Sequence, residues 1–274
     1  MNVHSDNPGK RAAERWYLVY TPIWGAVSAA VMVTGLAERM SDAAFMVYGV
    51  GLWLGALVPP YFLRAAEDRG RPAASLYHSK FQLWMFVFAF LGNYWTEYFY
   101  QILHMQYGFA TTWNVNDVPL FLYFVTVAYF TTYGTLLNMA YRFLARRLDA
   151  DAVWMRRLAF VGACCAVAFL ETALNANPFI ERLFCYDDLP FMLWFGTLMY
   201  GCWFLIAAPF WFPIDETPDT VTPWRDVAGG VLAAFMLVIV YNETMLHVVA
   251  PWFTTVEYGA VGMGNFGTSC LPAR

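Results

Sequence analysis

Charged residues are scarce in this chain of 274 residues, where Asp, Glu, Lys and Arg make up 13%. A soluble globular protein carries about 25%. Basic residues number 16 against 20 acidic ones, and hydrophobic residues make up 60%. The scarcity therefore excludes an ordinary soluble enzyme and a disordered chain, and the absence of a basic surface excludes a nucleic-acid partner. It favours an all-α polytopic membrane protein whose partner is the lipid bilayer.

Long apolar stretches supply the spans that this interpretation requires. A spanning helix needs about 20 mostly apolar residues, and seven stretches qualify, which predicts a bundle of about seven transmembrane helices. They are residues 16–38, 42–63, 80–104, 119–142, 157–177, 189–212 and 225–249.

Lysine is the rarest charged residue, with Lys10 and Lys80 the two in the sequence. Both lie at predicted span boundaries, so a seven-helix retinal protein, which needs a lysine inside the bundle, is excluded. No spacing of cysteine and histidine resembles a metal site. We expect no metal and no cofactor.

The basic residues sort to one side of the predicted spans, 13 against 3. By the positive-inside rule this predicts a cytoplasmic N-terminus and an outside C-terminus. The predicted organisation is a polar cytoplasmic segment 1–15, a transmembrane domain 16–249 and a glycine-rich outer tail 250–274. Cys185 and Cys270 both fall outside, where they are able to form a disulfide. The oligomeric state stays open.

Three glutamates fall inside predicted spans, where a charged side chain costs at least ~2.5–3.5 kcal/mol. Counting 1.5 Å per residue from the nearest basic boundary residue puts Glu97, Glu171 and Glu243 at depths of about 26, 21 and 27 Å. All three therefore belong to the outer half of a hydrocarbon layer of about 30 Å. We expect them to face one another around a cavity, because facing lipid would leave them unpaired.

Each glutamate has a polar companion four residues away, which puts the two on one helix face. The pairs are Glu97 with Asn93, Glu171 with Asn175, and Glu243 with His247. Burial favours the neutral form of a carboxyl, and a neutral buried carboxylic acid is a proton donor for general acid catalysis. The aromatic residues around Glu97 are expected to wall the cavity, where aromatic faces stabilise a cation: Tyr94, Trp95, Tyr98, Phe99 and Tyr100. His104 continues the polar stripe of the third span.

Short motifs along residues 15–272 resemble, in order and spacing, the cycloeucalenol cycloisomerase (cyclopropyl sterol isomerase) family. The matching stretches are Arg15-Trp16, Tyr20-Thr21-Pro22-Ile23-Trp24, Gly92-Asn93-Tyr94-Trp95-Thr96 with Tyr98-Phe99, Trp113, Asn116-Asp117-Val118-Pro119, Glu171-Thr172 with Ala176-Asn177, Asp215-Glu216, and Cys270-Leu271-Pro272. The resemblance implies cofactor-independent opening of the 9β,19-cyclopropane ring of a cyclopropyl sterol to give a Δ8 sterol. The ring carbon C19 is protonated and a proton leaves C8.

The resemblance also suggests roles for particular residues. Glu171 matches a glutamate of the family and is our expected acid. Glu243 with His247, or Glu97, is expected to accept the second proton, although plant members carry histidine where Glu97 stands. The remaining sites are expected to bind the sterol: Asn93, Tyr94, Trp95, Tyr98, His104, Trp113, Asn116, Asn175 and Asn177.

Some alternatives stay open from the sequence. Another sterol or isoprenoid double-bond isomerase, of the Δ8–Δ7 type, needs the same acid and base, and a proton-coupled lipid carrier or sterol-binding protein needs the same buried carboxyl. Asp215-Glu216 is expected to cap the last span or anchor its loop. Arginine outnumbers lysine 14 to 2, which is typical of a GC-rich genome. We expect the inner membrane if the source is a bacterium and the endoplasmic reticulum if it is a eukaryote.

Overall fold

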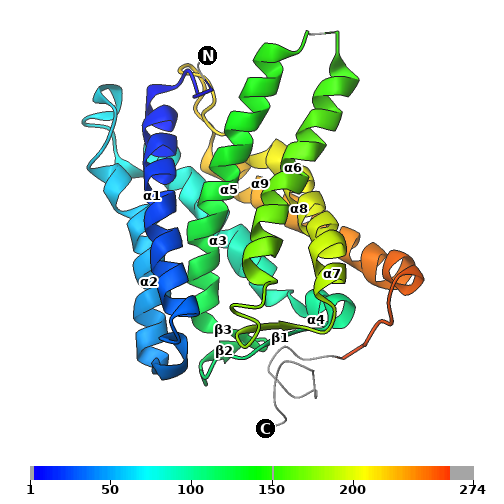
Figure 1. The fold of residues 1–274 in the computed structure, drawn as a ribbon. Helices are drawn as coiled ribbons and strands as arrows, with labels where there is room; N and C mark the ends of the chain where they lie inside the picture. The colour runs from blue at the N-terminus through cyan, green and yellow to red at the C-terminus, as the bar shows by residue number, and fades with distance from the viewer. Residues whose placement is uncertain (1–2, 150, 260–274) are drawn as a thin grey trace.

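The computed structural model describes residues 3–149 and 151–259, and Figure 1 shows that they form a helical bundle with small strands at one end. Seven long helices run between the two ends of the bundle. They are α1 (Pro8–Val33), α2 (Asp42–Leu57), α3 (Tyr77–Tyr94), α5 (Leu120–Arg147), α6 (Val153–Asn175), α8 (Thr197–Trp211) and α9 (Trp224–Thr244).

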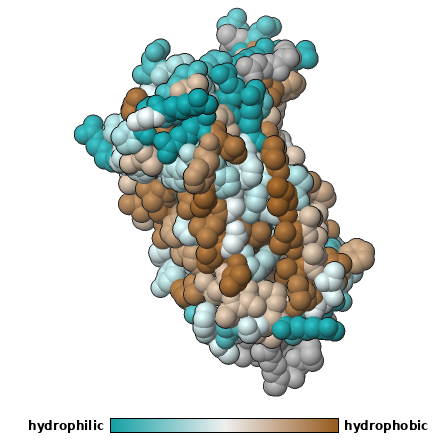
Figure 2. Space-filling view, turned by 90° about the vertical axis from the view of Figure 1, so that its left-hand side faces the viewer, coloured by the Kyte–Doolittle hydropathy of each residue, from teal (hydrophilic) through white to brown (hydrophobic). Residues whose placement is uncertain are grey.

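Six of the helical segments are long and apolar enough to cross a membrane, which confirms a multi-pass helical membrane protein. α3, with 18 residues, is not among them. Figure 2 shows hydrophilic residues gathered at one end of the molecule and an apolar belt across its middle. Val19, Ile23 and Val27 of α1 and Val47 of α2 are among the exposed apolar side chains. The cytoplasmic placement of the N-terminus stays a prediction.

The predicted third span, 80–104, is wrong as a single helix. α3 ends at Tyr94, and a separate short helix, α4 (Glu97–Leu103), follows after a turn at Trp95 and Thr96. The Trp95 amide donates to Leu91 O and the Thr96 amide to Asn93 O, a tighter bond that closes the last turn of α3. The four-residue spacing of Asn93 and Glu97 therefore does not put them on one helix face.

Two small sheets close the end of the bundle away from the N-terminus (Figure 1). Strands β1 (Met105–Tyr107) and β4 (Phe184–Tyr186) pair antiparallel, with Gln106 opposite Cys185. Strands β2 (Asn114–Val115) and β3 (Val118–Pro119) form a hairpin. A one-turn helix α7 (Leu189–Phe191) and a π-helical turn (Met192–Gly196) then lead into α8. Cys270, the predicted partner of Cys185, lies outside the described residues, as does most of the predicted outer tail.

Helix α5 is the centre of the bundle. In its apolar stretch 78% of the residues are buried, against 17% for α1 and 28% for α6. Helices α1, α2, α3 and α6 all pack against it. Gly49 of α2 permits one of these close contacts, because a Cβ there would lie 2.5 Å from the Phe121 carbonyl oxygen of α5.

Buried ion pairs join the helices at the end that carries the N-terminus. Arg142 of α5 holds Glu14 of α1 at 2.8 Å and Glu216, in the loop between α8 and α9, at 2.6 Å. Lys10 of α1 reaches the same Glu216 at 2.8 Å. Burial opposes the charge on Glu216, but Arg142 and Lys10 outweigh it and hold the pKa of that carboxyl below its ordinary value.

A second buried pair fixes the same loop to α3, with Lys80 Nζ 2.7 Å from Asp215 Oδ2. The other Asp215 oxygen accepts from the Thr222 amide at 2.7 Å. Asp215-Glu216 is therefore a loop anchor, one of the two roles expected from the sequence. It is not the cap of α9, which begins after Pro223.

Removing Arg142 is expected to destabilise the protein strongly. Arg142→Met leaves the fully buried Glu14 without its cation, and breaking a buried pair from one side costs about 3–5 kcal/mol. Thermal unfolding in detergent measures the loss. Arg142→Met combined with Glu14→Leu is expected to recover part of it, and Arg225→Met, whose pair with Asp226 is exposed, is expected to cost about 0–1 kcal/mol. Equal unfolding temperatures for all three variants would contradict the role of this network.

Candidate active site

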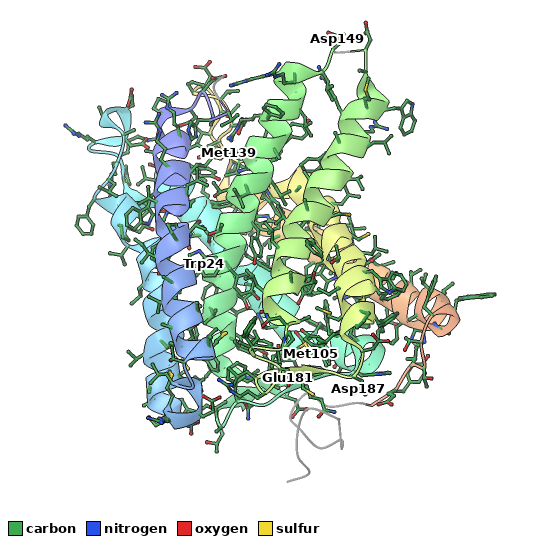
Figure 3. All side chains as sticks on the ribbon, viewed as in Figure 1. Trp24, Met105, Met139, Asp149, Glu181 and Asp187 are labelled. Atoms are coloured by element: carbon green, nitrogen blue, oxygen red, sulfur yellow. The ribbon has the colours of Figure 1, made fainter. Side chains whose placement is uncertain are left out.

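A cavity of about 510 Å³ lies within the bundle, a size typical of sites for small organic ligands. Its wall is built by α1, α3, α5, α6 and α8, and strands β1 and β4 contribute Met105 and Tyr186 at the strand end. Figure 3 labels Trp24 of α1 and Met105 of β1, two of these wall residues. The wall is mainly aromatic and aliphatic, which suits an apolar ligand.

The rim of the cavity is formed by exposed apolar side chains of α1 and of the C-terminal end of α6. Val33 is 51% exposed, Leu174 60% and Phe179 72%, and all three line the cavity. Behind them α1 and α6 both pack against α5. Gly25 and Ala29 keep the α1 side of the opening flat, and a Cβ at Gly25 would meet no atom within 4 Å. The cavity therefore opens sideways, toward the lipid-facing side of the bundle.

Glu171 lies beside this cavity, on the inner face of α6. Its side chain is 1% exposed, and neither carboxyl oxygen has a hydrogen-bond partner among the described residues. The group that interacts with it most directly is the Tyr129 hydroxyl, in a geometry looser than an ordinary hydrogen bond. Within the described residues no lysine or arginine pairs with it, unlike Glu14 and Glu216 at the polar end. An unpaired carboxyl inside a membrane bundle indicates a functional site.

Five tyrosines surround the Glu171 carboxyl and line the cavity. They are Tyr107, Tyr129, Tyr133, Tyr186 and Tyr200. Burial, with Glu171 as a smaller cause, raises the pKa of Tyr107 and of Tyr186 on the two strands. These phenols therefore stay protonated and present neutral hydroxyl groups to the cavity.

Hydrogen bonds link Asn93, Thr126 and Tyr129, the tyrosine that interacts most directly with Glu171. Asn93 Nδ2 donates to Thr126 Oγ1 at 2.9 Å, and Thr126 Oγ1 lies 3.0 Å from the Tyr129 hydroxyl. Thr126 and Tyr129 were not predicted from the sequence. The sequence does carry a pattern that indicates them. Thr126, Tyr129 and Tyr133 are spaced by three and four residues, which puts three hydroxyl groups on one face of α5.

Asn175 and Asn177 also lie on the cavity wall, near its rim. The Asn175 side chain makes no hydrogen bond within the described part of the chain, so its amide is available to a ligand. Asn177 is engaged in the turn after α6, where its amide donates to Leu174 O at 2.7 Å and its oxygen accepts from the Phe179 amide at 3.1 Å. The structure therefore brings together four of the predicted site residues: Asn93, Glu171, Asn175 and Asn177.

The expectation that all three glutamates face one cavity is wrong. Glu243 is 52% exposed on α9, where its carboxylate accepts from the Tyr98 hydroxyl at 2.7 Å and lies 3.1 Å from His247. The predicted pairing of Glu243 with His247 is confirmed. Both side chains point away from the cavity. The prediction failed because the depth of a residue along a helix does not determine which way its side chain faces.

Glu97, Tyr94 and Trp95 also lie off the cavity wall. Glu97 is at the start of α4, partly buried, and near Tyr98. Tyr94 is 45% exposed, and Trp95 packs against Phe235 of α9. The break between α3 and α4 is the physical reason, since it turns this aromatic segment away from Asn93.

The remaining predicted residues lie at the end of the bundle that carries the small β-sheets, here called the strand end. His104 ends α4 in a left-handed conformation and donates to the Thr255 carbonyl at 2.9 Å. Asn116 and Asp117 both have positive φ angles and form the two-residue turn between β2 and β3, as expected of a type I′ hairpin. Trp113 is 49% exposed beside this hairpin, where its carbonyl accepts from the Leu120 amide. The Asn116-Asp117-Val118-Pro119 stretch that resembles the family is therefore a turn at the strand end and not part of the cavity wall.

Comparison with known proteins agrees with the motifs. No family model and no solved structure matches the chain. The sequence is 31% identical over 247 residues to cycloeucalenol cycloisomerase of Arabidopsis thaliana, a match that covers 85% of this chain and 84% of the plant protein. With that identity over most of both chains, this protein belongs to the cycloeucalenol cycloisomerase family.

Proposed function

We propose that this protein is a cofactor-independent isomerase that opens the 9β,19-cyclopropane ring of a cyclopropyl sterol to give a Δ8 sterol. The observation that carries the proposal is an unpaired buried carboxyl, Glu171, beside a mainly apolar cavity of about 510 Å³. The name of the plant relative supports the substrate class. A membrane sterol suits a cavity whose rim is apolar and open toward lipid.

The proposed reaction balances without an added reagent. A proton goes to C19, the C9–C19 bond breaks and its electron pair forms the new C–H bond of a methyl group. The tertiary cation left at C9 loses a proton from C8, whose C–H electrons form the C8–C9 double bond. Aromatic faces such as Phe130 and Trp203 on the cavity wall favour a cation nearby.

We assign Glu171 as the source of the first proton. After giving it up, the carboxylate is the base that we assign to the second step, because the described cavity wall itself includes no carboxyl and no imidazole and Glu171 lies directly behind it. Glu243 with His247, and Glu97, were the bases expected from the sequence, and they lie off that wall. The Gly-rich tail beyond residue 259 contains no Asp, Glu, His or Lys side chain to add to it.

The sterol hydroxyl is assigned to Asn175, whose amide is free at the rim. Glu171 precedes it by four residues, about 6 Å along α6. In the sterol, the C3 hydroxyl and the C10 end of the cyclopropane occupy opposite corners of ring A. A sterol that enters with its hydroxyl on Asn175 therefore carries its three-membered ring to the level of Glu171.

Incubation of purified protein with cycloeucalenol in heavy water tests the reaction. We expect a Δ8 product with deuterium in the C19 methyl group, and with Glu171→Gln a loss of about 10²–10⁴-fold, the usual contribution of a general acid. Glu243→Gln is the matched control, and we expect it to stay within a few-fold of wild type.

Three outcomes of this experiment would count against the proposal. Sterol bound without covalent change would indicate a carrier, and a shifted double bond with the ring intact would indicate another isomerase. Full activity of Glu171→Gln with loss in Glu243→Gln would move the chemistry to the α9 pair.

Asn175→Leu is expected to lower kcat/KM selectively for sterols that carry the 3-hydroxyl group. Losing one neutral hydrogen bond costs about 1 kcal/mol, so kcat/KM for the 3-hydroxy substrate should fall roughly fivefold. The 3-deoxy analogue, which has no hydroxyl to bind, is expected to react equally well with wild type and variant. Equal losses for both substrates would show that Asn175 does not bind the hydroxyl.

Gly25→Leu is expected to obstruct the opening between α1 and α6 without disturbing the protein, because nothing lies within 4 Å of the added Cβ. We expect kcat/KM for the sterol to fall at least tenfold with an unchanged unfolding temperature. Gly51→Leu is the matched control: Gly51 of α2 also has open space around it and does not line the cavity. Equal activity of both variants would exclude entry at this side.

A further inference from the structure

The cavity wall beside Glu171 is made of phenols rather than of the carboxyl itself. Glu171 is 1% exposed and is not one of the residues that line the cavity, whereas Tyr129, Tyr133 and Tyr200 are. A proton that starts on Glu171 therefore has a tyrosine hydroxyl between it and a ligand in the cavity. One of these tyrosine hydroxyls must therefore pass the proton from Glu171 to the ligand.

Of the five tyrosines on the described cavity wall, Tyr129 is the one whose hydroxyl approaches the Glu171 carboxyl as a hydrogen-bonding group. On its other side, the Tyr129 hydroxyl lies 3.0 Å from Thr126 Oγ1. Tyr133 and Tyr200 have ring contacts, and their hydroxyls have no hydrogen-bond partner among the described residues. The Tyr129 ring also packs against the ring of Trp24 of α1 in a tilted arrangement, with 6.3 Å between the ring centroids.

The single hydrogen of each hydroxyl determines which atom donates in the hydrogen bonds among Asn93, Thr126 and Tyr129. Thr126 Oγ1 donates its single hydrogen to the Leu122 carbonyl at 2.7 Å and accepts from Asn93 at 2.9 Å. Tyr129 is therefore the donor to Thr126, since a hydroxyl has one hydrogen and two lone pairs. The free lone pairs of Tyr129 are left for Glu171, which can donate to them when it is protonated.

We propose that the Tyr129 hydroxyl is the catalytic group that touches the substrate, and that Glu171 acts through it as the proton reservoir. Asn93 and Thr126 are positioning residues that hold the Tyr129 hydroxyl in place. The inference rests on the proposed ring-opening function and adds the atom that transfers the proton.

The relay balances in both steps. Tyr129 turns its O–H from Thr126 to C19 and gives up that proton while it receives the proton of Glu171, so the phenol stays neutral and a carboxylate is left. In the second step the Tyr129 oxygen takes the proton from C8 and returns its own to the Glu171 carboxylate. The phenol and the carboxylic acid are both restored, and the sterol has gained one proton and lost one.

Tyr129→Phe, which removes the hydroxyl and keeps the ring, tests the relay. We expect kcat to fall by about 10²-fold, the lower range of general acid catalysis. Binding of a 3-hydroxy sterol that has no cyclopropane ring should change only a few-fold. Tyr123→Phe is the matched control, a buried phenol of the same helix α5 that does not line the cavity, and we expect it to keep kcat within a few-fold.

Two further measurements separate a chemical role from a structural one. The double variant Tyr129→Phe with Glu171→Gln should be no slower than the slower single variant, because groups that act as one unit are not additive. Replacing Tyr129 by 3-fluorotyrosine, a more acidic phenol, should move the alkaline limb of the kcat–pH profile to lower pH. The same replacement at Tyr123 should leave the profile in place.

The outcomes also distinguish this inference from the function on which it rests. A folded wild type that opens no cyclopropane ring overturns both. An active wild type with undiminished Tyr129→Phe, or with additive losses in the double variant, overturns the relay and leaves Glu171 as a direct acid. Equal losses in Tyr129→Phe and Tyr123→Phe, with weaker sterol binding in both, overturn it in favour of a packing role.

Discussion

Helix α5 is enclosed by protein for most of its length, and the rest of the structure depends on this enclosure. An enclosed helix can carry hydroxyls, an amide and an arginine that lipid would not tolerate. At one end its Arg142 joins α1 to the loop before α9. Further along, Thr126 and Tyr129 face the cavity. The same helix therefore holds the bundle together and supplies the polar face of the site.

Carboxyls in this protein occupy two contrasting environments. Glu14 and Asp215 are buried and Glu216 is half-buried, each with lysine or arginine within 2.9 Å, and their role is to hold helices and loops in place. Glu171 is as deeply buried as Glu14 and has no ion-pair partner among the described residues. Burying a polar group without a partner costs free energy, so packing alone gives no reason to keep Glu171. A reaction that needs a neutral acid in apolar surroundings does.

Part of this structure could be predicted from the sequence. Apolar length indicated the helical membrane class, and the cost of charge in lipid identified Glu171 with Asn93 and Asn175 nearby. The break after Tyr94 was not predictable from hydropathy, because the residues on both sides of it are aromatic and apolar. The outward direction of Glu243 depends on how α9 packs, which its position in the sequence does not specify. The Thr126 and Tyr129 stripe was visible, but hydroxyls and aromatics in membrane helices usually serve packing and interfaces.

The strand pair β1–β4 has a consequence for how molecules move through the site. Its residues Met105, Tyr107, Phe184 and Tyr186 form part of the cavity wall at one end of the bundle, while the rim lies between α1 and α6. Strands joined by backbone hydrogen bonds make a firmer boundary than loose loops would. With this boundary at the strand end, the described residues leave the opening between α1 and α6 for a ligand to enter and to leave. For the proposed isomerase, turnover then depends on how readily the bilayer takes up the released product.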